Sequence, residues 1–152
     1  MCVAAGHAIQ DGNGNSYLMP IDFTFEKKTE NEGFNVSELI SYFDYSENKC
    51  LIIIDACRND GNNGLPKPNI QDPLNVKLGY STSFGKTASD NSDLNNSIYT
   101  KFLSDMLLVP ENTIENILYS TAMQVLFKTK EQQQPTSYFG IYLNKIKINS
   151  SY

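Results

Sequence analysis

The chain has 152 residues, of which 40% are hydrophobic and 19% are charged, and this balance is typical of one compact domain with a buried core. The net charge of −5 and the scattered Lys and Arg residues argue against nucleic acid as a partner, because phosphate binding needs clustered basic side chains. No apolar run approaches the ~18 residues of a membrane helix, so no membrane partner is expected.

Cysteine usage favours a reducing compartment. The cysteines number three, which is odd, and the N-terminus lacks the basic and long apolar regions of a signal peptide. Cys2, Cys50 and Cys57 are therefore expected to be reduced thiols of a cytoplasmic protein. For Cys2 and Cys50 the expected role is that of a small hydrophobic side chain.

The first predicted strand is Met1–Ala5, a short buried run that ends at Gly6-His7. The turn residues of Asp11–Asn15 follow and predict a hairpin-like excursion that returns through Tyr17-Leu18. The oxygen-bearing side chains of this stretch superficially resemble a calcium loop. Such a loop needs Gly at its sixth place, where this chain has Ser16, and a turn is therefore the prediction.

Three helices are predicted from apolar residues at helical spacing and from capping residues. Asn35 is the expected cap of a helix over Val36–Tyr45, and Thr113 that of a helix over Ile114–Lys128. The remaining helix covers Ile98–Leu108. Each has an apolar face that suits packing against a sheet.

The remaining predicted strands are Leu51–Ile54, Lys77–Ser83 and Tyr138–Leu143. The first consists of four aliphatic residues, which is typical of a central parallel strand buried on both faces. The stretch from Arg58 to Val76 is rich in Asn, Gly and Pro and predicts a long loop. Strands that alternate with helices predict an α/β fold, with helices on the faces of a sheet.

His7 and Cys57 each follow an apolar run, and they lie fifty positions apart. His7 is the only histidine, so any Cys–His pair must use it. The working groups of open α/β sheets collect beyond the carboxyl ends of strands, where both residues are expected. An imidazole there favours the thiolate and later protonates a leaving amine. A structural histidine and a core cysteine are the alternatives, but together the two residues predict a catalytic pair.

Four segments resemble caspase-like cysteine proteases, in particular those of the metacaspase and orthocaspase type. AGHAIQDGNGNSYLMPID is similar to the histidine segment of these proteins, and LIIIDACRND is similar to their cysteine box. GYSTSFGKTASD resembles the Y-S-T strand of the small subunit, and Gln133-Gln134-Pro135 resembles the Q-x-P segment before the last strand. The segments follow the family's order over nearly the whole chain. The resemblance implies a three-layer α/β/α fold with a mostly parallel sheet.

The resemblance also divides the chain. Residues 1–60 correspond to the large subunit, 61–76 to the inter-subunit loop and 77–147 to the small subunit. Caspase-like domains place further strands before the histidine strand, so the N-terminal part of the large subunit is expected to be absent. The chain is then a fragment or processed product, a protein whose sheet edge is completed by a partner chain or by self-association, or a decayed pseudoprotease.

Site roles follow from the same resemblance. Cys57 would be the nucleophile and His7 the acid–base, while the oxyanion donors would be the backbone N–H groups of Cys57 and of Ala8, which replaces the family's usual glycine. No metal ligand is assigned and no cofactor is required. Calcium stimulation is an analogy with metacaspases.

The substrate pocket is predicted to be acidic. Asp55 stands where caspases carry a pocket glutamine, and Asp90, beside Ala88 and Ser89, stands where they carry a pocket arginine. Two carboxylates would attract Arg or Lys and repel aspartate. The prediction is an endopeptidase that cleaves proteins or peptides after Arg or Lys. The alternative roles are a helix-cap or turn carboxylate for Asp55 and a solvated loop charge for Asp90.

Two further expectations concern processing and the inactive alternative. Lys67 and Lys77 are acceptable to an acidic pocket, which predicts self-cleavage in this region. The alternative function is a catalytically weak or inactive caspase-like scaffold that pairs with a complete relative.

Overall fold

The structure is a computed structural model, and it describes residues 1–11, 13, 15–20, 22, 33–44, 49–57, 73–83, 96–138 and 140–148. The strands are β1 (Cys2–Gly6), β2 (Ala8–Gln10), β3 (Ser16–Leu18), β4 (Phe34–Asn35), β5 (Cys50–Ala56), β6 (Val76–Tyr80), β7 (Asn112–Thr113), β8 (Thr136–Tyr138) and β9 (Lys147–Ile148). The helices are α1 (Val36–Asp44), α2 (Ile98–Leu107), α3 (Ile114–Lys128) and the short 3-10 helix η2 (Ile141–Leu143).

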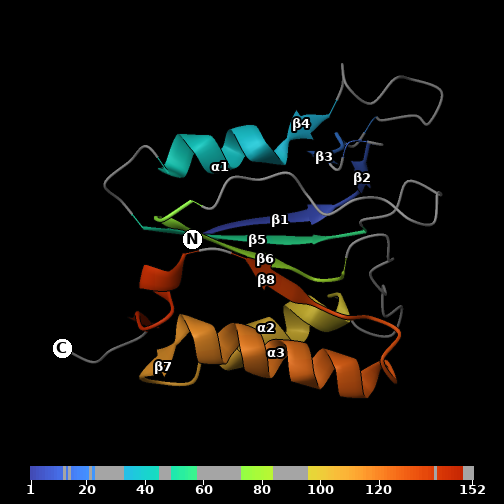
Figure 1. Ribbon diagram of the computed structural model, residues 1–152. Coiled ribbons are helices and arrows are strands. Elements are labelled where there is room, and N and C mark those ends of the chain that lie inside the picture. The colour runs from blue at the N-terminus through green and yellow to red at the C-terminus, as the bar shows by residue number, and fades with distance from the viewer. Residues whose placement is uncertain are drawn as a thin grey trace.

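A four-stranded sheet in the order β1-β5-β6-β8 forms the middle layer. Strands β1, β5 and β6 are parallel, and β8 runs antiparallel to β6. Helix α1 covers one face of the sheet, and α2 and α3 cover the other (Figure 1). The predicted three-layer α/β/α fold with a mostly parallel sheet is confirmed.

Strand β5 is the centre of the core. All of its residues are buried, and Ile52, Ile53 and Ile54 have no exposed surface. Because successive side chains of a strand point to opposite faces, Ile52 and Ile54 pack in the cluster that contains α1, while Leu51 and Ile53 pack with α2 and α3. The prediction of a central parallel strand over Leu51–Ile54 is confirmed.

The helices begin where their capping residues predict. The side-chain oxygen of Asn35 accepts from the backbone N–H of Ser37 at 2.8 Å, at the start of α1. The Thr113 hydroxyl accepts from the N–H of Asn116 at 3.2 Å, at the start of α3. These caps satisfy backbone donors that the first turn of a helix leaves unpaired.

The predicted hairpin is also confirmed. Strands β2 and β3 pair antiparallel, and the Asp11 carboxylate holds the turn by accepting from the backbone N–H groups of Asn13 at 2.9 Å and Asn15 at 2.8 Å. Burial acts to raise the pKa of Asp11, but the hydrogen bonds, led by those from Asn15, outweigh it and lower that pKa. The Asp11 carboxylate thus stabilises the turn, as the sequence predicts.

Two predictions about strands are wrong. The first strand is not buried, because β5 is its one neighbour among the described strands, and Val3 is 50% exposed. The strand predicted over Tyr138–Leu143 is β8, which ends at Tyr138, followed by η2. Gly140 separates them with a φ of +61°, and it lies so close to the backbone of β6 that a Cβ would stand 2.8 Å from the Val76 carbonyl oxygen.

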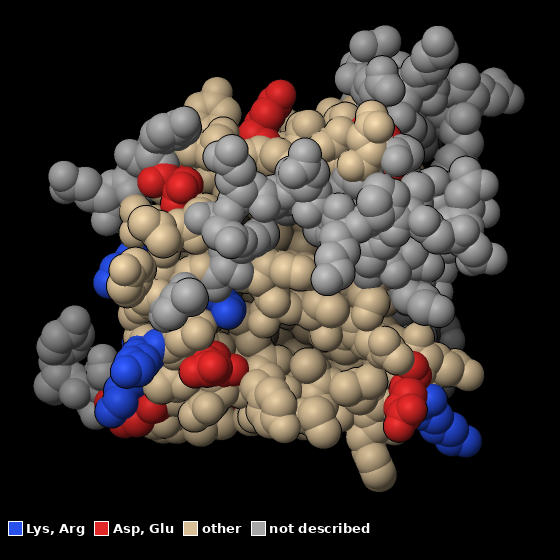
Figure 2. All heavy atoms as spheres, viewed as in Figure 1, with Lys and Arg blue, Asp and Glu red and all other residues tan. Residues whose placement is uncertain are grey.

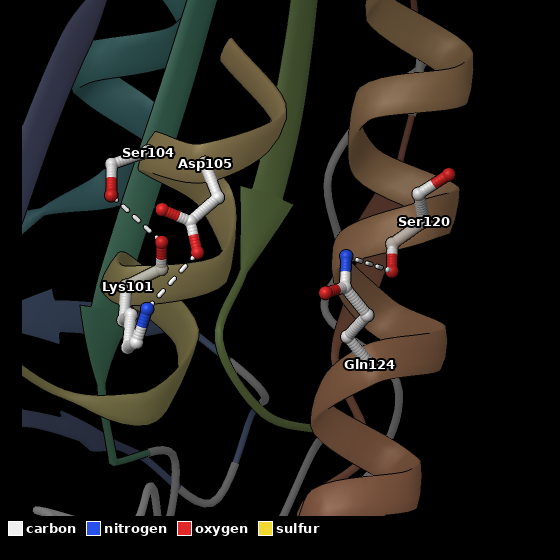
Figure 3. Close-up of polar contacts among 5 residues, drawn as sticks. All are labelled: Lys101, Ser104, Asp105, Ser120 and Gln124. Atoms are coloured by element: carbon white, nitrogen blue, oxygen red, sulfur yellow. Dashed lines mark hydrogen bonds and ion pairs between the residues drawn. The ribbon is translucent and has the colours of Figure 1, made fainter. Parts of the chain in front are cut away.

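Helices α2 and α3 carry local polar contacts (Figure 3). Lys101 and Asp105, one turn apart on α2, form an exposed ion pair of 3.1 Å. On α3 the Gln124 amide donates to the carbonyl of Ser120 at 3.4 Å. Within the described residues, no helix combines the length and the apolar character needed to cross a membrane.

Replacing Thr113 with Ala is expected to lower the free energy of unfolding by about 1 kcal/mol, because the helix that covers one sheet face loses its cap. Thr113→Ser, which keeps the hydroxyl, is the matched control and should retain most of the stability. Urea denaturation followed by circular dichroism measures both. Equal stability of the Ala and Ser variants would contradict the capping role.

Candidate active site

The register of β1 on β5 brings His7 and Cys57 to the same edge of the sheet. Gly6 is the register partner of Ala56, so His7 and Cys57 follow at neighbouring positions just beyond two paired strands. Adjacent strands lie roughly 4.8 Å apart, so the two backbones emerge side by side. His7 is exposed, and Cys57 is half-buried. An imidazole and a thiol thus leave the sheet together, one facing solvent and the other partly enclosed.

Gly6 sets the direction in which the chain leaves β1. Its φ is +145°, a conformation that residues with a side chain rarely adopt, although a Cβ would meet no atom within 4 Å. Only His7 separates β1 from β2, which belongs to a different sheet. The glycine therefore permits the sharp change of direction that leaves His7 at the junction of the two sheets.

The backbone N–H of Ala8 points away from β3. Ala8 is the register partner of Leu18. The residues next to this pair are bonded to each other, because the Met19 N–H donates to the His7 carbonyl at 2.9 Å. This pattern marks Ala8 and Leu18 as a non-hydrogen-bonded pair, whose own N–H and C=O groups face outward. The N–H next to the histidine is thus left outside the β2–β3 ladder.

Asp55 is anchored to the start of α2. It is 6% exposed, and its Oδ2 accepts short hydrogen bonds from the hydroxyls of Ser97 and Thr100, the latter 2.5 Å. The Ser97 hydroxyl in turn accepts from the Thr100 N–H at 3.0 Å, so carboxylate and helix cap form one network. Both bonds use Oδ2, and no donor among the described residues bonds to Oδ1. The carboxylate therefore has a structural role and, within the described part of the chain, keeps one oxygen available.

Ser97 and Thr100 were not predicted as site residues. Ser97 directly precedes the apolar residues of α2, which is the ordinary signal of a helix cap. That signal predicts a bond within the helix start but not the bond to Asp55, because Asp55 lies forty-two positions earlier. Burial and, second, the Asp55 charge raise the pKa of the neighbouring Tyr99 phenol above its usual range.

Hydrogen bonds hold the segment after β6 beside the site. The N–H of Ser81 donates to the carbonyl of Ile54 at 2.9 Å, and the carbonyl of Ser81 accepts from the side chain of Gln133 at 2.8 Å. Gln133 is 1% exposed. The Ser83 hydroxyl donates to the Gln134 carbonyl at 2.7 Å. The segments that resemble the family's Y-S-T and Q-x-P motifs are thus joined to each other.

Four predicted site residues lie outside the part of the chain that the structure describes: Ala88, Ser89, Asp90 and Lys67. Lys77 is in β6 and is 8% exposed, so self-cleavage at this residue would require the strand to leave the sheet. Among the described residues, no three His, Cys, Asp or Glu side chains form a group able to hold a metal ion.

The fold and the sheet edge that carries His7 and Cys57 define a class of protein: three-layer α/β proteins with a histidine and a cysteine at neighbouring strand ends. The chain belongs to the caspase domain family (Peptidase_C14), a family of cysteine peptidases that act on proteins, and the family model matches residues 1–142. Among curated proteins, no match is found.

Among solved structures, the chain is similar to caspase-1 from Spodoptera frugiperda, with a TM-score of 0.60 and 17% sequence identity. The match covers 90% of this chain and 57% of that chain, so this chain spans little more than half of the caspase-1 structure. At this identity the likeness concerns the fold.

Replacing Gln133 with Ala is expected to lower the free energy of unfolding by about 1–3 kcal/mol, because the buried carbonyl of Ser81 loses its donor. Gln132→Ala removes an exposed amide from the same turn and is the matched control, expected to change stability by less than about 0.5 kcal/mol. Thermal and urea unfolding measure the difference. A Gln133 variant as stable as the control would mean that the bond contributes little.

Proposed function

We propose that the protein is a cysteine endopeptidase that uses His7 and Cys57 and cleaves after Arg or Lys, as metacaspases and orthocaspases do. The observation that carries this proposal is the register of β1 on β5, which ends both strands at neighbouring positions before the two residues. Membership of the caspase domain family supports the reaction class.

In the proposed reaction the Cys57 thiolate attacks the carbonyl carbon of the scissile peptide bond, and a carbon–sulfur bond forms. Protonated His7 gives its proton to the leaving amine as the carbon–nitrogen bond breaks. Water then attacks the acyl-enzyme and transfers a proton to His7. The carbon–sulfur bond breaks, and the thiolate is restored.

The developing oxyanion requires backbone donors, for which we propose the N–H groups of Ala8 and Cys57. The outward direction of the Ala8 N–H supports this assignment, because the ladder with β3 does not use it. The φ of Gly6 is part of the same arrangement, since it sets how the chain turns into Ala8.

We propose that Asp55 binds the basic side chain of the substrate, through the oxygen that the Ser97 and Thr100 hydroxyls leave unused. A charged acceptor in a partly desolvated pocket attracts an Arg or Lys side chain and repels a carboxylate. Asp90, with Ala88 and Ser89, is proposed to complete this pocket. Lys67 remains a candidate for self-cleavage, and calcium stimulation remains an analogy.

The second candidate is a weak or inactive caspase-like scaffold that binds a complete relative. The observation that favours it is the open side of β1, where Met1 is 69% and Val3 is 50% exposed. A strand of small apolar residues with one described neighbour offers its free hydrogen-bonding groups to another strand.

A peptidyl acyloxymethyl ketone with Arg beside the reactive group is expected to label the protein at Cys57. The Cys57→Ala variant should show no labelling, and His7→Ala should reduce the rate at least about a hundredfold, because the imidazole favours the thiolate. Cys2→Ala, which removes another thiol, is the control and should label normally. Mass spectrometry of the adduct measures the outcome. A protein that never labels would favour the scaffold.

Peptides that vary only the residue before the scissile bond test the pocket. Arg and Lys are expected to be preferred over Asp. Asp55→Asn should lower kcat/KM for the Arg peptide by at least about tenfold, because the substrate charge loses its partner. Asp105→Asn, an exposed carboxylate on α2, is the matched control and should leave kcat/KM unchanged. Preference for aspartate would contradict the acidic pocket.

A further inference from the structure

A cavity of about 270 Å³ lies on the face of the sheet that α3 covers, and neither the catalytic pair nor the proposed substrate pocket includes its residues. Lys77 of β6 and Tyr99 of α2 form part of its wall. The remaining lining residues come from α3 and from the start of β8: Glu115, Leu118, Tyr119, Ala122, Pro135, Thr136 and Ser137. The size is close to the lower end of small-molecule sites, roughly 300 Å³. Figure 2 shows a mainly neutral surface where the helix layer meets the sheet layer, with basic and acidic groups at its border.

The most unusual residue in the wall of the cavity is Lys77. Lysine is seldom nine-tenths buried without a partner, yet Lys77 is 8% exposed. Among the described residues the ion pairs are Lys101–Asp105 and Lys147–Glu111, so Lys77 has none. Burial lowers the pKa of Lys77, and the charge of Glu115 offsets this only in part. A buried cation without a paired anion would be stabilised by an anionic ligand.

The other polar groups suit a carboxylate. Tyr99 and Ser137 both line the cavity, and among the described residues neither side-chain hydroxyl has a hydrogen-bond partner. Gly79 allows the Tyr99 hydroxyl to lie close to β6, because a Cβ at this position would stand 3.2 Å from the hydroxyl oxygen. An ammonium and two hydroxyl donors provide the complement of a carboxylate, which accepts but does not donate.

The rest of the wall limits the size and charge of the ligand. Leu118, Ala122 and Pro135 are apolar and would contact a small hydrocarbon group, to which the Tyr119 ring adds a flat surface. Glu115 also lines the cavity, and its negative charge opposes a second negative charge on the ligand. We propose that this cavity binds a small monocarboxylate with an apolar or aromatic body, its carboxylate on Lys77 and its body against α3.

Phenylacetate is the probe, and phenylacetamide, the same shape without the charge, is its matched control. Titration followed by NMR and calorimetry is expected to show saturable phenylacetate binding, with phenylacetamide at least about tenfold weaker. Lys77→Met should weaken phenylacetate binding by at least about tenfold. Lys101→Met, which removes an equal charge from the surface of α2, should leave it unchanged.

Glu115→Gln provides a second variant that does not disturb the core, because Glu115 is exposed. It should bind phenylacetate more tightly than the unmodified protein, since a repulsive charge is removed. The proposal would be overturned by equal binding of phenylacetate and phenylacetamide, by absence of saturable binding, or by unchanged affinity in a folded Lys77→Met variant. Tighter binding of inorganic phosphate than of phenylacetate would likewise contradict a monocarboxylate site. None of these results depends on peptidase activity.

Discussion

The parallel pairing of β1 with β5 is the constraint on which the candidate site depends. Its register, with Gly6 opposite Ala56, decides which residues emerge together at the sheet edge. A shift by one residue would turn every side chain of β1 to the other face and would also offset His7 from Cys57. Because β5 is buried along its whole length, its own position is fixed by the core, and β1 takes its register from it.

The parts of this fold that the sequence predicts well are those that local residues determine. Four aliphatic residues in Leu51–Ile54 require burial on both faces, which in an α/β chain means a central strand. Asn35 and Thr113 start helices through bonds that reach only two or three residues along the chain. The placement of His7 and Cys57 at one edge of the sheet was predictable for a related reason, since parallel strands end at one edge.

The features that the sequence did not reveal depend on residues far apart in the chain. Asp55 was predicted as a pocket residue, with helix capping as an alternative, but its partners Ser97 and Thr100 at the start of α2 were not predicted. The exposure of β1 depends on what lies beside it in the sheet, which its apolar composition does not indicate. The residue pattern of β6 does not indicate which face of the sheet Lys77 occupies, and its burial follows from the packing of α3. Tertiary contacts of this kind have no local pattern.

The separation in sequence between paired strands has a kinetic consequence. Cys2 pairs with Ile52, and Gln133 binds Ser81, so the contacts that build the sheet edge close long segments of chain. Closing such segments costs entropy before the contacts compensate for it, and proteins dominated by distant pairings fold slowly. The edge that carries His7 and Cys57 therefore forms only when β1 pairs with β5, fifty positions along the chain. A newly synthesised chain would thus hold its thiol and imidazole apart until this pairing is made.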